Sequence, residues 1–514
     1  MLTRIANVCL ATVLSCGSAW AQMPLSAIDW LSDSLTESAS GPLPAYSVHD
    51  ESTRTGAPGP DTISVAPVGD VNSNSVGLFP GTATGLPTSL LEAADSSEIT
   101  ALLLETGRGP LPSMRRLLFD LLLAEAPRSG TADSGGRLFL ARVDSLLDLG
   151  AVEQARALLE RVGPSDPERF RRWFDVGLLT GTEREACVRF SRTPELLKSL
   201  SARVFCLARN GDLGAASVTL AAGRATGAVS GADAALLTRF LNLYAEDDTE
   251  PLPVPMHPSP LEFRIHEAIG EPLSTETLPR AFARADLRPN IGWKARVEAA
   301  ERLVRSGAIS ANLLLGLYAK PEPEASGGVW RRSAVIQRVD AAIRERDSER
   351  IAETLPDAWR EMRRKGLETV LAELYGDALR EIDLEMSVGS IAYRIMLLSD
   401  EYETAAEHHV PIDIDERFLR AVSMGEPENA EAPNDVARAI ASGFRAADTQ
   451  ERIPGNAGND DPGAMVLAAV RKMRDSGMGD LGSLSEAIAL FRKAGLEEVA
   501  RRAALEAMIL DKPA

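Results

Sequence analysis

The chain has 514 residues and a formal charge of −19, with 74 Asp and Glu against 55 Lys and Arg. Such an acidic chain disfavours nucleic acid, whose phosphates are neutralised by Lys and Arg, and it disfavours an anionic lipid surface. The basic residues are 48 Arg and 7 Lys, which we interpret as composition and helix-surface charge rather than as anion-binding forks. The length allows a large core or several domains.

Residues 1–21 have the features of a secretory signal peptide. Arg4 makes the first residues positive, residues 8–14 are apolar, and Ala19-Trp20-Ala21 has the small-x-small pattern that a signal peptidase reads. The apolar run is shorter than the about 20 residues that span a bilayer. We therefore expect cleavage after Ala21, no transmembrane anchor, and a periplasmic or secreted protein. The mature chain would keep 54 Lys and Arg against 74 Asp and Glu, a formal charge of −20.

Cys16 supports an alternative, because Val13-Leu14-Ser15-Cys16 resembles the lipobox of bacterial lipoproteins. In that family the Cys is lipidated and becomes the mature N-terminus, which would anchor the protein to a membrane. Leu14 departs from the small residue usual at its position, and the box ending at Ala21 competes with this site. A lipid anchor at Cys16 is thus our second interpretation.

Residues 22–86 form a low-complexity segment. From about residue 31, Gly, Pro, Ser, Thr, Asn and Asp dominate. Such a composition cannot bury enough apolar surface to order itself, so we expect most of the segment to be disordered. Two apolar islands interrupt it, at residues 63–68 and 76–79. They fit an extended linker and a strap that docks on the folded body equally well.

A helical hairpin is the clearest predicted element after residue 87. One apolar stripe at helical spacing consists of Phe139, Val143, Leu146 and Leu147. Gly150 ends this helix at a position suited to a left-handed residue. The second stripe runs from Val152 to Val162 and ends at Pro164 and Pro167. Because the turn is very short, the two helices are expected to be antiparallel neighbours.

Parts of this hairpin recur. Gly150, Val152, Ala155 and Leu159 match, 61 residues later, Gly211, Leu213, Ala216 and Leu220. Gly495 and Ala500 repeat the Gly and the small residue once more.

The unit resembles a tetratricopeptide repeat of about 34 residues. The positions that carry its aromatic, turn, apolar, small, apolar and terminal Pro residues are Phe139, Gly150, Val152, Ala155, Leu159 and Pro167. Val143 and Val162 depart from this pattern, since they occupy slots that the family fills with small residues, and no constant period runs through the chain. The resemblance therefore implies an irregular helical solenoid, not a regular array.

The predicted fold is all-α, an irregular superhelical stack of antiparallel helical hairpins, because strand signals are nearly absent after residue 90. The run Pro251-Leu252-Pro253-Val254-Pro255-Met256-His257-Pro258 predicts a boundary between two lobes. The first lobe would be residues 87–250 and the second residues 251–514.

Two motifs resemble ligand sites without the context that those sites need. Residues 477–482 match G-x-G-x-x-G, but a helical pattern precedes them where a dinucleotide site needs a strand. We interpret them as a turn between helices, with Ser483 and Glu486 as the capping box of the second helix. The candidate metal ligands are Glu403, Glu407, His408, His409, Asp413 and Asp415. Since the adjacent His408 and His409 point to different faces of a helix, we interpret this group as a solvated helix end and a loop.

Two residue pairs are also ordinary surface features in our interpretation. Glu262 and His266 share a helix face and are expected to be a surface pair. Glu51-Ser52 has the dipeptide of lytic transglycosylases, but it lacks the Gly-rich substrate motif that follows in those enzymes.

Cys187 and Cys206 are the cysteines outside the signal, and they form a candidate disulfide that export would permit. They lie on successive predicted helices around Thr193-Pro194. Antiparallel packing would offset them by on the order of 10 Å. A bridge needs Cα atoms within about 7 Å, which only a short, tilted first helix would allow.

The sequence has no nucleophile elbow, phosphate loop or Cys-x-x-Cys pair, so we expect no cofactor or metal. We expect a non-catalytic exported scaffold or adaptor that binds another protein of the cell envelope, since stacked helical hairpins offer extended binding surfaces. The acidic charge predicts a basic or mixed-charge partner, met along the inner face of the stack. The alternative is an envelope enzyme or cell-wall-binding protein whose site is assembled from scattered residues.

Overall fold

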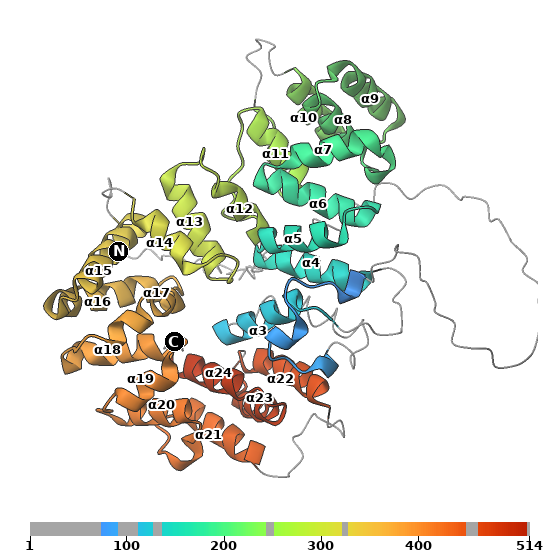
Figure 1. Ribbon diagram of the computed structural model, residues 1–514. Coiled ribbons are helices and arrows are strands. Elements are labelled where there is room, and N and C mark those ends of the chain that lie inside the picture. The colour runs from blue at the N-terminus through green and yellow to red at the C-terminus, as the bar shows by residue number, and fades with distance from the viewer. Residues whose placement is uncertain are drawn as a thin grey trace, which may run out of the picture.

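The computed structural model describes residues 73–90, 111–126, 136–242, 251–320, 327–448, 461–477 and 479–510. Within these ranges the chain forms α-helices and short 3-10 helices, without β-strands (Figure 1). The predicted all-α fold class is therefore confirmed. The expected signal peptide, Cys16 and the island at residues 63–68 lie outside the described residues.

The part of the chain before residue 270 contains the following helices: η2 (Ser73–Ser75), η3 (Gly81–Ala83), η4 (Thr88–Leu90), α3 (Pro112–Leu123), α4 (Arg137–Leu149), α5 (Val152–Val162), α6 (Pro167–Thr180), α7 (Glu183–Arg192), η5 (Pro194–Leu196), α8 (Leu200–Arg209), α9 (Leu213–Thr226), α10 (Gly231–Leu241) and α11 (Pro260–Ala268).

The remaining part contains these: η6 (Arg280–Phe282), α12 (Ala283–Asp286), α13 (Trp293–Val304), α14 (Ala311–Tyr318), α15 (Gly328–Glu345), α16 (Ser348–Arg363), α17 (Glu368–Arg380), α18 (Met386–Leu397), α19 (Tyr402–His408), α20 (Ile414–Met424), η7 (Pro427–Asn429), α21 (Asp435–Asp448), α22 (Pro462–Ser476), α23 (Leu481–Lys493) and α24 (Glu497–Ile509).

The helical hairpin predicted around Gly150 is formed by α4 and α5. Gly150 ends α4 with a φ of 82°, a left-handed conformation that a side chain would strain. The related Gly211 and Gly495 separate α8 from α9 and α23 from α24. The recurrence of these residues thus marks three hairpin turns, while membership of the tetratricopeptide family stays a prediction.

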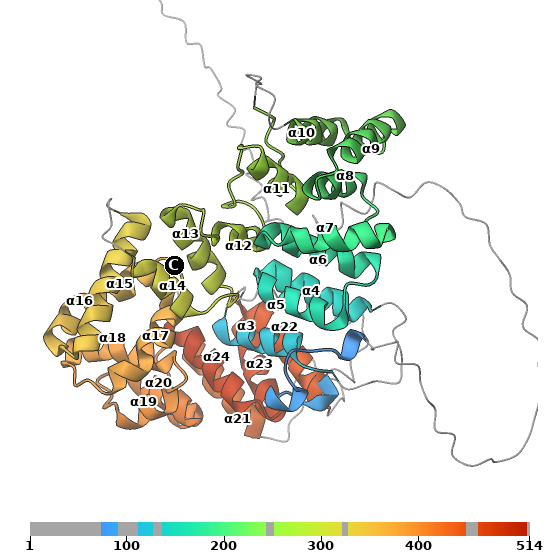
Figure 2. The same cartoon turned by 45° about the horizontal axis from the view of Figure 1, so that its top comes forward.

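The last helix packs against the first long one. α24 lies beside α3, and α22 contacts η4, so that the helices from α12 onward close a circuit with α3 and α4 (Figures 1 and 2). The carboxylate of Glu506 in α24 accepts hydrogen bonds from Ser113 N at 2.8 Å and from Ser113 Oγ at 2.6 Å, at the first turn of α3. Helices α5 to α11 form an arm that leaves this circuit.

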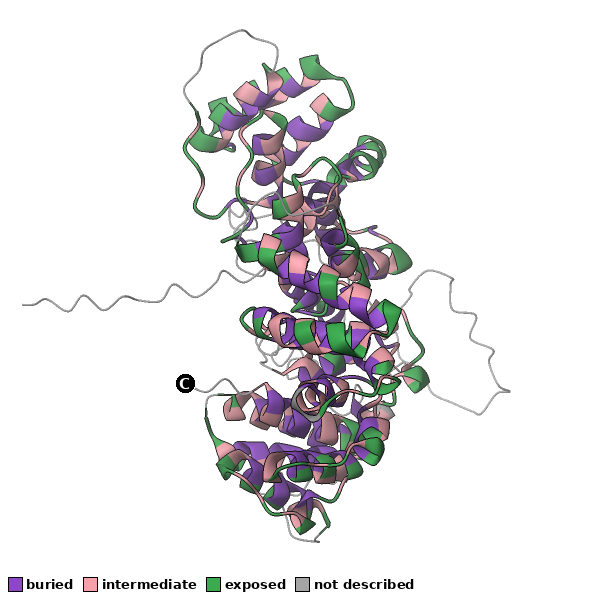
Figure 3. Ribbon diagram, turned by 90° about the vertical axis from the view of Figure 1, so that its left-hand side faces the viewer, coloured by how far each residue is buried: buried purple, intermediate pink, exposed green. Residues whose placement is uncertain are grey.

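Two buried clusters stabilise the circuit and the arm. The larger one extends from Leu90 to Ile509 and includes residues of α3 to α6 and of α11 to α24. The smaller one lies in the arm, between Phe170 and Phe240, with Ile265 of α11 added. Figure 3 shows buried residues along the inside of both parts. Both clusters include residues of α6 and α11, and the expected lobe boundary at residue 250 stays a prediction.

Residues 73–79 dock on the helical body as a strap. The backbone amides of Leu78 and Phe79 both donate to Leu123 O, and Glu125 N donates to Phe79 O at 2.8 Å. The guanidinium of Arg142 in α4 also donates a hydrogen bond to Val76 O, at 2.7 Å. At this end of the low-complexity segment, the structure therefore distinguishes between the two interpretations that we left open for the apolar islands. The docked alternative applies to the island at residues 76–79.

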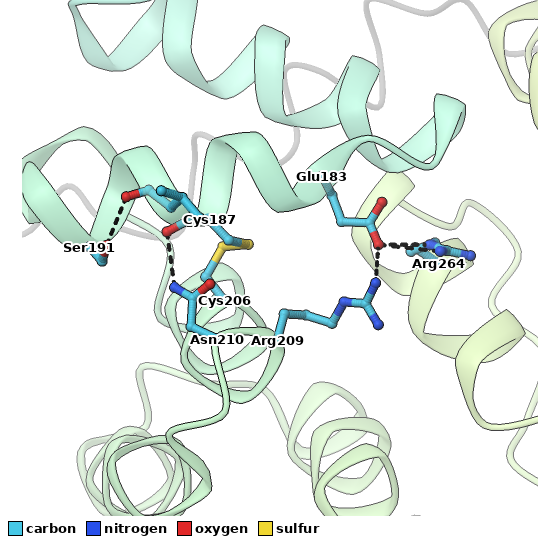
Figure 4. The surroundings of a disulfide bond; sticks show 8 residues. Glu183, Cys187, Ser191, Cys206, Arg209, Asn210 and Arg264 are labelled. Carbon is cyan, nitrogen blue, oxygen red and sulfur yellow. Dashed lines mark hydrogen bonds and ion pairs between the residues drawn. A yellow bond between two sulfur atoms is a disulfide. The ribbon is translucent and has the colours of Figure 1, made fainter.

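Cys187 and Cys206 form a disulfide between α7 and α8, with their Cα atoms 4.9 Å apart (Figure 4). Our expected offset of on the order of 10 Å placed the turn at Thr193-Pro194. In the structure the turn continues to Ser199, since η5 follows α7 and α8 begins only at Leu200. The two cysteines are therefore nearly the same distance from the turn.

The bridge predicts a chemical result. Both sulfur atoms lie in fully buried side chains, so we expect no free thiol at these positions in the folded, oxidised protein. Thiol counting in denaturant, without reductant, on a chain that lacks residues 1–21 should give zero. Two thiols per chain would contradict the bridge, and a reduced sample that gives two is the control.

Candidate protein-binding surface

Residues 400–435 carry much of the negative charge of the chain. They contain eleven Asp and Glu against two Arg, a formal charge of −9 in a segment that covers α19, α20 and η7. α20 packs against both α19 and η7, and α19 and α20 lie at the lower edge of the circuit (Figure 1). The acidic groups are thus concentrated on one part of the molecule.

Neighbouring helices neutralise only part of this charge. Asp400 pairs with Arg116 and Arg502, and Glu403 pairs with Arg501, all at 2.8 to 3.0 Å. Within the described residues, the following side chains form no ion pair: Glu407, Asp415, Glu426 and Glu431. Glu407, Glu426 and Glu431 are exposed, and Asp415 is half-buried.

The connection between α19 and α20 exposes two apolar side chains. Val410 is 80% exposed and Ile412 is 52% exposed. Pro411 between them has no amide hydrogen, and it favours an extended conformation of Val410. We call residues 409–413 the apolar loop.

Glu416 holds the apolar loop from inside. Its side chain is fully buried and accepts hydrogen bonds from Ser390 Oγ at 2.6 Å and from Ile412 N at 3.0 Å. His409 Nε2 lies 2.8 Å from the same carboxylate, and the His409 ring stacks on Tyr393. Burial acts to raise the pKa of Glu416, but the hydrogen bonds from Ser390 and His409 outweigh it and lower the pKa. The apolar loop is therefore held in place by the charged carboxylate of Glu416, whose two oxygens both have hydrogen-bond partners within the protein.

This arrangement of apolar and charged side chains resembles that of a protein–protein interface. A small apolar centre, Val410 and Ile412, stands among charged groups, as the apolar core and polar rim of an interface do. Exposed apolar side chains on a fixed loop lose little conformational entropy on binding. We call the apolar loop with Glu407, Asp415, Glu426 and Glu431 the acidic surface.

Four of the candidate metal ligands, Glu403, His408, His409 and Asp413, have other partners, whereas Glu407 and Asp415 form no ion pair with any described residue. His408 Nδ1 contacts Thr404 O at 2.8 Å, and Asp413 caps α20 by accepting from Glu416 N at 2.7 Å. In the described part of the chain, no three His, Cys, Asp or Glu side chains are placed to hold a metal ion together.

The G-x-G-x-x-G motif lies between two helices, α22 and α23, with Met478 outside the described residues. The predicted capping residue was wrong. Asp480, not Ser483, caps α23, because its carboxylate accepts from Gly482 N at 3.0 Å and from Ser483 Oγ at 2.7 Å. Asp is an equally good cap, and with Asp480 as the cap the helix starts three residues earlier than predicted.

Glu262 and His266 do not form the expected surface pair. Glu262 completes a capping box with Ser259 at the start of α11. His266 is only 3% exposed, because α11 packs against α6 and α10. Its side chain therefore belongs to the interior, and this desolvation lowers the pKa of His266.

An apolar cavity lies between η4, α3 and α22, but it is too small for a ligand. Its volume is about 10 Å³, and Leu90, Met114 and Leu467 are among its lining residues. Such a volume is at the limit for one water molecule. The exposed acidic surface is therefore a better candidate for binding than this cavity.

A scan against protein-family models found no matching family, and searches of curated proteins and of solved structures found no match. Among the described helices, none combines the length and the apolar character needed to cross a bilayer.

Proposed function

We propose that this protein is an exported, non-catalytic scaffold or adaptor that binds another protein of the cell envelope through the acidic surface. The observation that carries the proposal is the apolar loop, with Val410 80% exposed and held by the buried Glu416. Large, exposed apolar side chains that are surrounded by acidic side chains are suited to recognition of another protein. The resemblance of α4 and α5 to a tetratricopeptide repeat supports a binding role by analogy.

The disulfide supports the exported location. Structural disulfides persist in oxidising compartments, and the bridge between Cys187 and Cys206 is buried. Together with the signal-like residues 1–21, it favours the periplasm or the outside of the cell.

The partner is expected to have a basic or mixed-charge surface. The formal charge of −9 in residues 400–435 attracts such a surface and speeds the encounter. This steering weakens with salt, since the screening length is about 8 Å at physiological ionic strength. We therefore propose a contact on α19 and α20, in place of the inner face of the stack that the sequence suggested.

Affinity capture with a charge-neutralised variant tests this function. The full chain would be immobilised and exposed to envelope proteins of the producing cell at low and at high salt. In the variant, four carboxylates of the acidic surface are removed by Glu407→Gln, Asp415→Asn, Glu426→Gln and Glu431→Gln. We expect a partner that is retained by the unchanged chain at low salt and lost with the variant.

The matched control removes four carboxylates elsewhere, by Glu195→Gln, Glu276→Gln, Glu349→Gln and Glu353→Gln, all exposed in the structure. It changes the net charge equally and should keep the partner. Equal capture by both variants would contradict the proposed surface. Retention on purified cell-wall material without capture of any protein would favour the alternative, a cell-wall-binding protein.

A further inference from the structure

The Pro-rich run that separates α10 from α11 is an ordered, extended segment. Residues 251–255 form neither helix nor turn, and the chain bends at residues 256–257 before α11 begins at Pro260. Pro251, Pro253 and Pro255 each fix their own φ near −65° and favour an extended conformation in the residue before them. These are the backbone preferences of a polyproline II helix.

The burial of the segment repeats every three residues, which is the period of that helix. Within the extended run, the edge formed by Leu252 and Pro255 is half-buried, and Pro258, beyond the bend, is buried. The other two edges are exposed, with Val254 at 75% and Met256 at 78%. One edge of the segment thus faces the protein, and two edges face outward.

The inner edge is fixed by specific contacts. Leu252 packs against the buried cluster of the arm, and Leu252 N donates to Glu271 Oε2 at 3.1 Å. Glu271 in turn pairs with Arg239 of α10 at 3.0 Å. The capping box of Ser259 and Glu262 holds the other end of the segment at the start of α11.

We propose that residues 251–257 are a docking segment for a partner protein domain with an aromatic-lined groove that recognises polyproline II helices. This proposal rests on the proposed scaffold function and adds a second contact to it. A preformed polyproline II helix loses little entropy when it binds, and its Pro and apolar side chains fit between aromatic rings.

The chemistry of the segment defines the groove. Residues 251–256 carry no charged side chain, so apolar contact and hydrogen bonds to the backbone carbonyls must supply the recognition. The groove therefore needs Trp or Tyr side chains, which offer an apolar ring together with an N–H or O–H donor. Unlike binding at the acidic surface, this contact is insensitive to salt.

Photo-crosslinking from the folded, full-length chain tests the proposal. A photoreactive residue would replace Met256, and the purified chain would be mixed with envelope proteins at low and at high salt. The comparison variant also carries Pro253→Ala and Pro255→Ala, which loosen the polyproline II backbone. We expect the yield of crosslinked partner to fall at least about fivefold in this variant, since preorganisation is lost. The yield should be equal at both salt concentrations.

Two further positions make the outcome decisive. Val218 of α9 is 71% exposed on the same arm and serves as the background control. Val410 reports the acidic surface, so a crosslink from position 410 without one from position 256 would overturn the docking segment and leave the proposed function intact. A yield from position 256 no higher than from position 218, no effect of the Pro substitutions with an unchanged thermal unfolding curve, or crosslinked partner peptides without aromatic residues would each overturn it as well.

Discussion

Replacement of Arg142 by Met is expected to destabilise the protein by about 4 kcal/mol or more and to release residues 73–79. The Arg142 side chain is 1% exposed, and its guanidinium donates to backbone carbonyls only. The acceptors are Leu122 O, Ala124 O and Val76 O, at 2.5 to 2.8 Å, and Asn74 O at 3.4 Å. Each buried carbonyl left without a donor costs about 1–3 kcal/mol.

Arg142 also joins the strap to the end of α3. Burial lowers its pKa to about 10, so the guanidinium stays charged at neutral pH. Arg142→Lys would keep the charge but could not span acceptors on both segments, and we expect most of the loss to remain. Urea denaturation would give the free energy of unfolding, and limited proteolysis would report cleavage within residues 73–79.

Arg161→Met is the matched control for this experiment. Arg161 pairs with Glu125 next to the strap, but half of its side chain is exposed. An exposed ion pair contributes at most about 1 kcal/mol, so this variant should be nearly as stable as the unchanged chain. A loss below about 1 kcal/mol for Arg142→Met would contradict the role of Arg142 as the anchor of the strap.

The second large effect concerns the closure of the circuit at Glu506. Burial raises the pKa of Glu506 from 4.5 to about 7, against the opposing hydrogen bonds from Ser113. The folded state therefore binds this proton more tightly than the unfolded state does. The stabilising contribution is fully present below about pH 4.5 and is lost as the pH rises through about 7. With 1.36 kcal/mol per pKa unit, the loss is about 3 kcal/mol.

The comparison with Glu506→Gln isolates this contribution. The Gln side chain cannot ionise, yet its carbonyl oxygen still accepts from the Ser113 amide. Burial also raises the pKa of Asp175 to about 7, but Asp175 is present in both proteins and cancels in the difference. We expect the stability of the unchanged chain, relative to the variant, to fall between pH 5 and 8.5. A difference that stays constant over this range would contradict the assignment.

The local elements of the fold could be predicted from the sequence, whereas its closure could not. Apolar stripes and Gly150 define α4 and α5 because helix periodicity and a left-handed turn are local properties. The contact between Ser113 and Glu506 joins residues 393 positions apart. Nothing in the spacing of either residue indicates the other, so the circuit emerges only from tertiary packing.

The negative charge of the acidic surface could be predicted from the sequence, but its geometry could not. The eleven carboxylates in residues 400–435 are a compositional signal that we missed by looking for metal ligands there. Glu416 follows Asp413 by three residues, as in a capping pair, but its burial depends on Ser390 in another helix. The exposure of Val410 follows from the position of α19 against α20, which no pattern of residues indicates.

Association kinetics with the captured partner test the central claim most directly. The association rate constant would be measured against ionic strength for the unchanged chain and for the variant that lacks the four carboxylates of the acidic surface. Electrostatic steering predicts that the rate for the unchanged chain falls steeply with salt, and that the variant binds more slowly with a weaker salt dependence. Identical rates and identical salt dependence for the two proteins would contradict binding through the acidic surface.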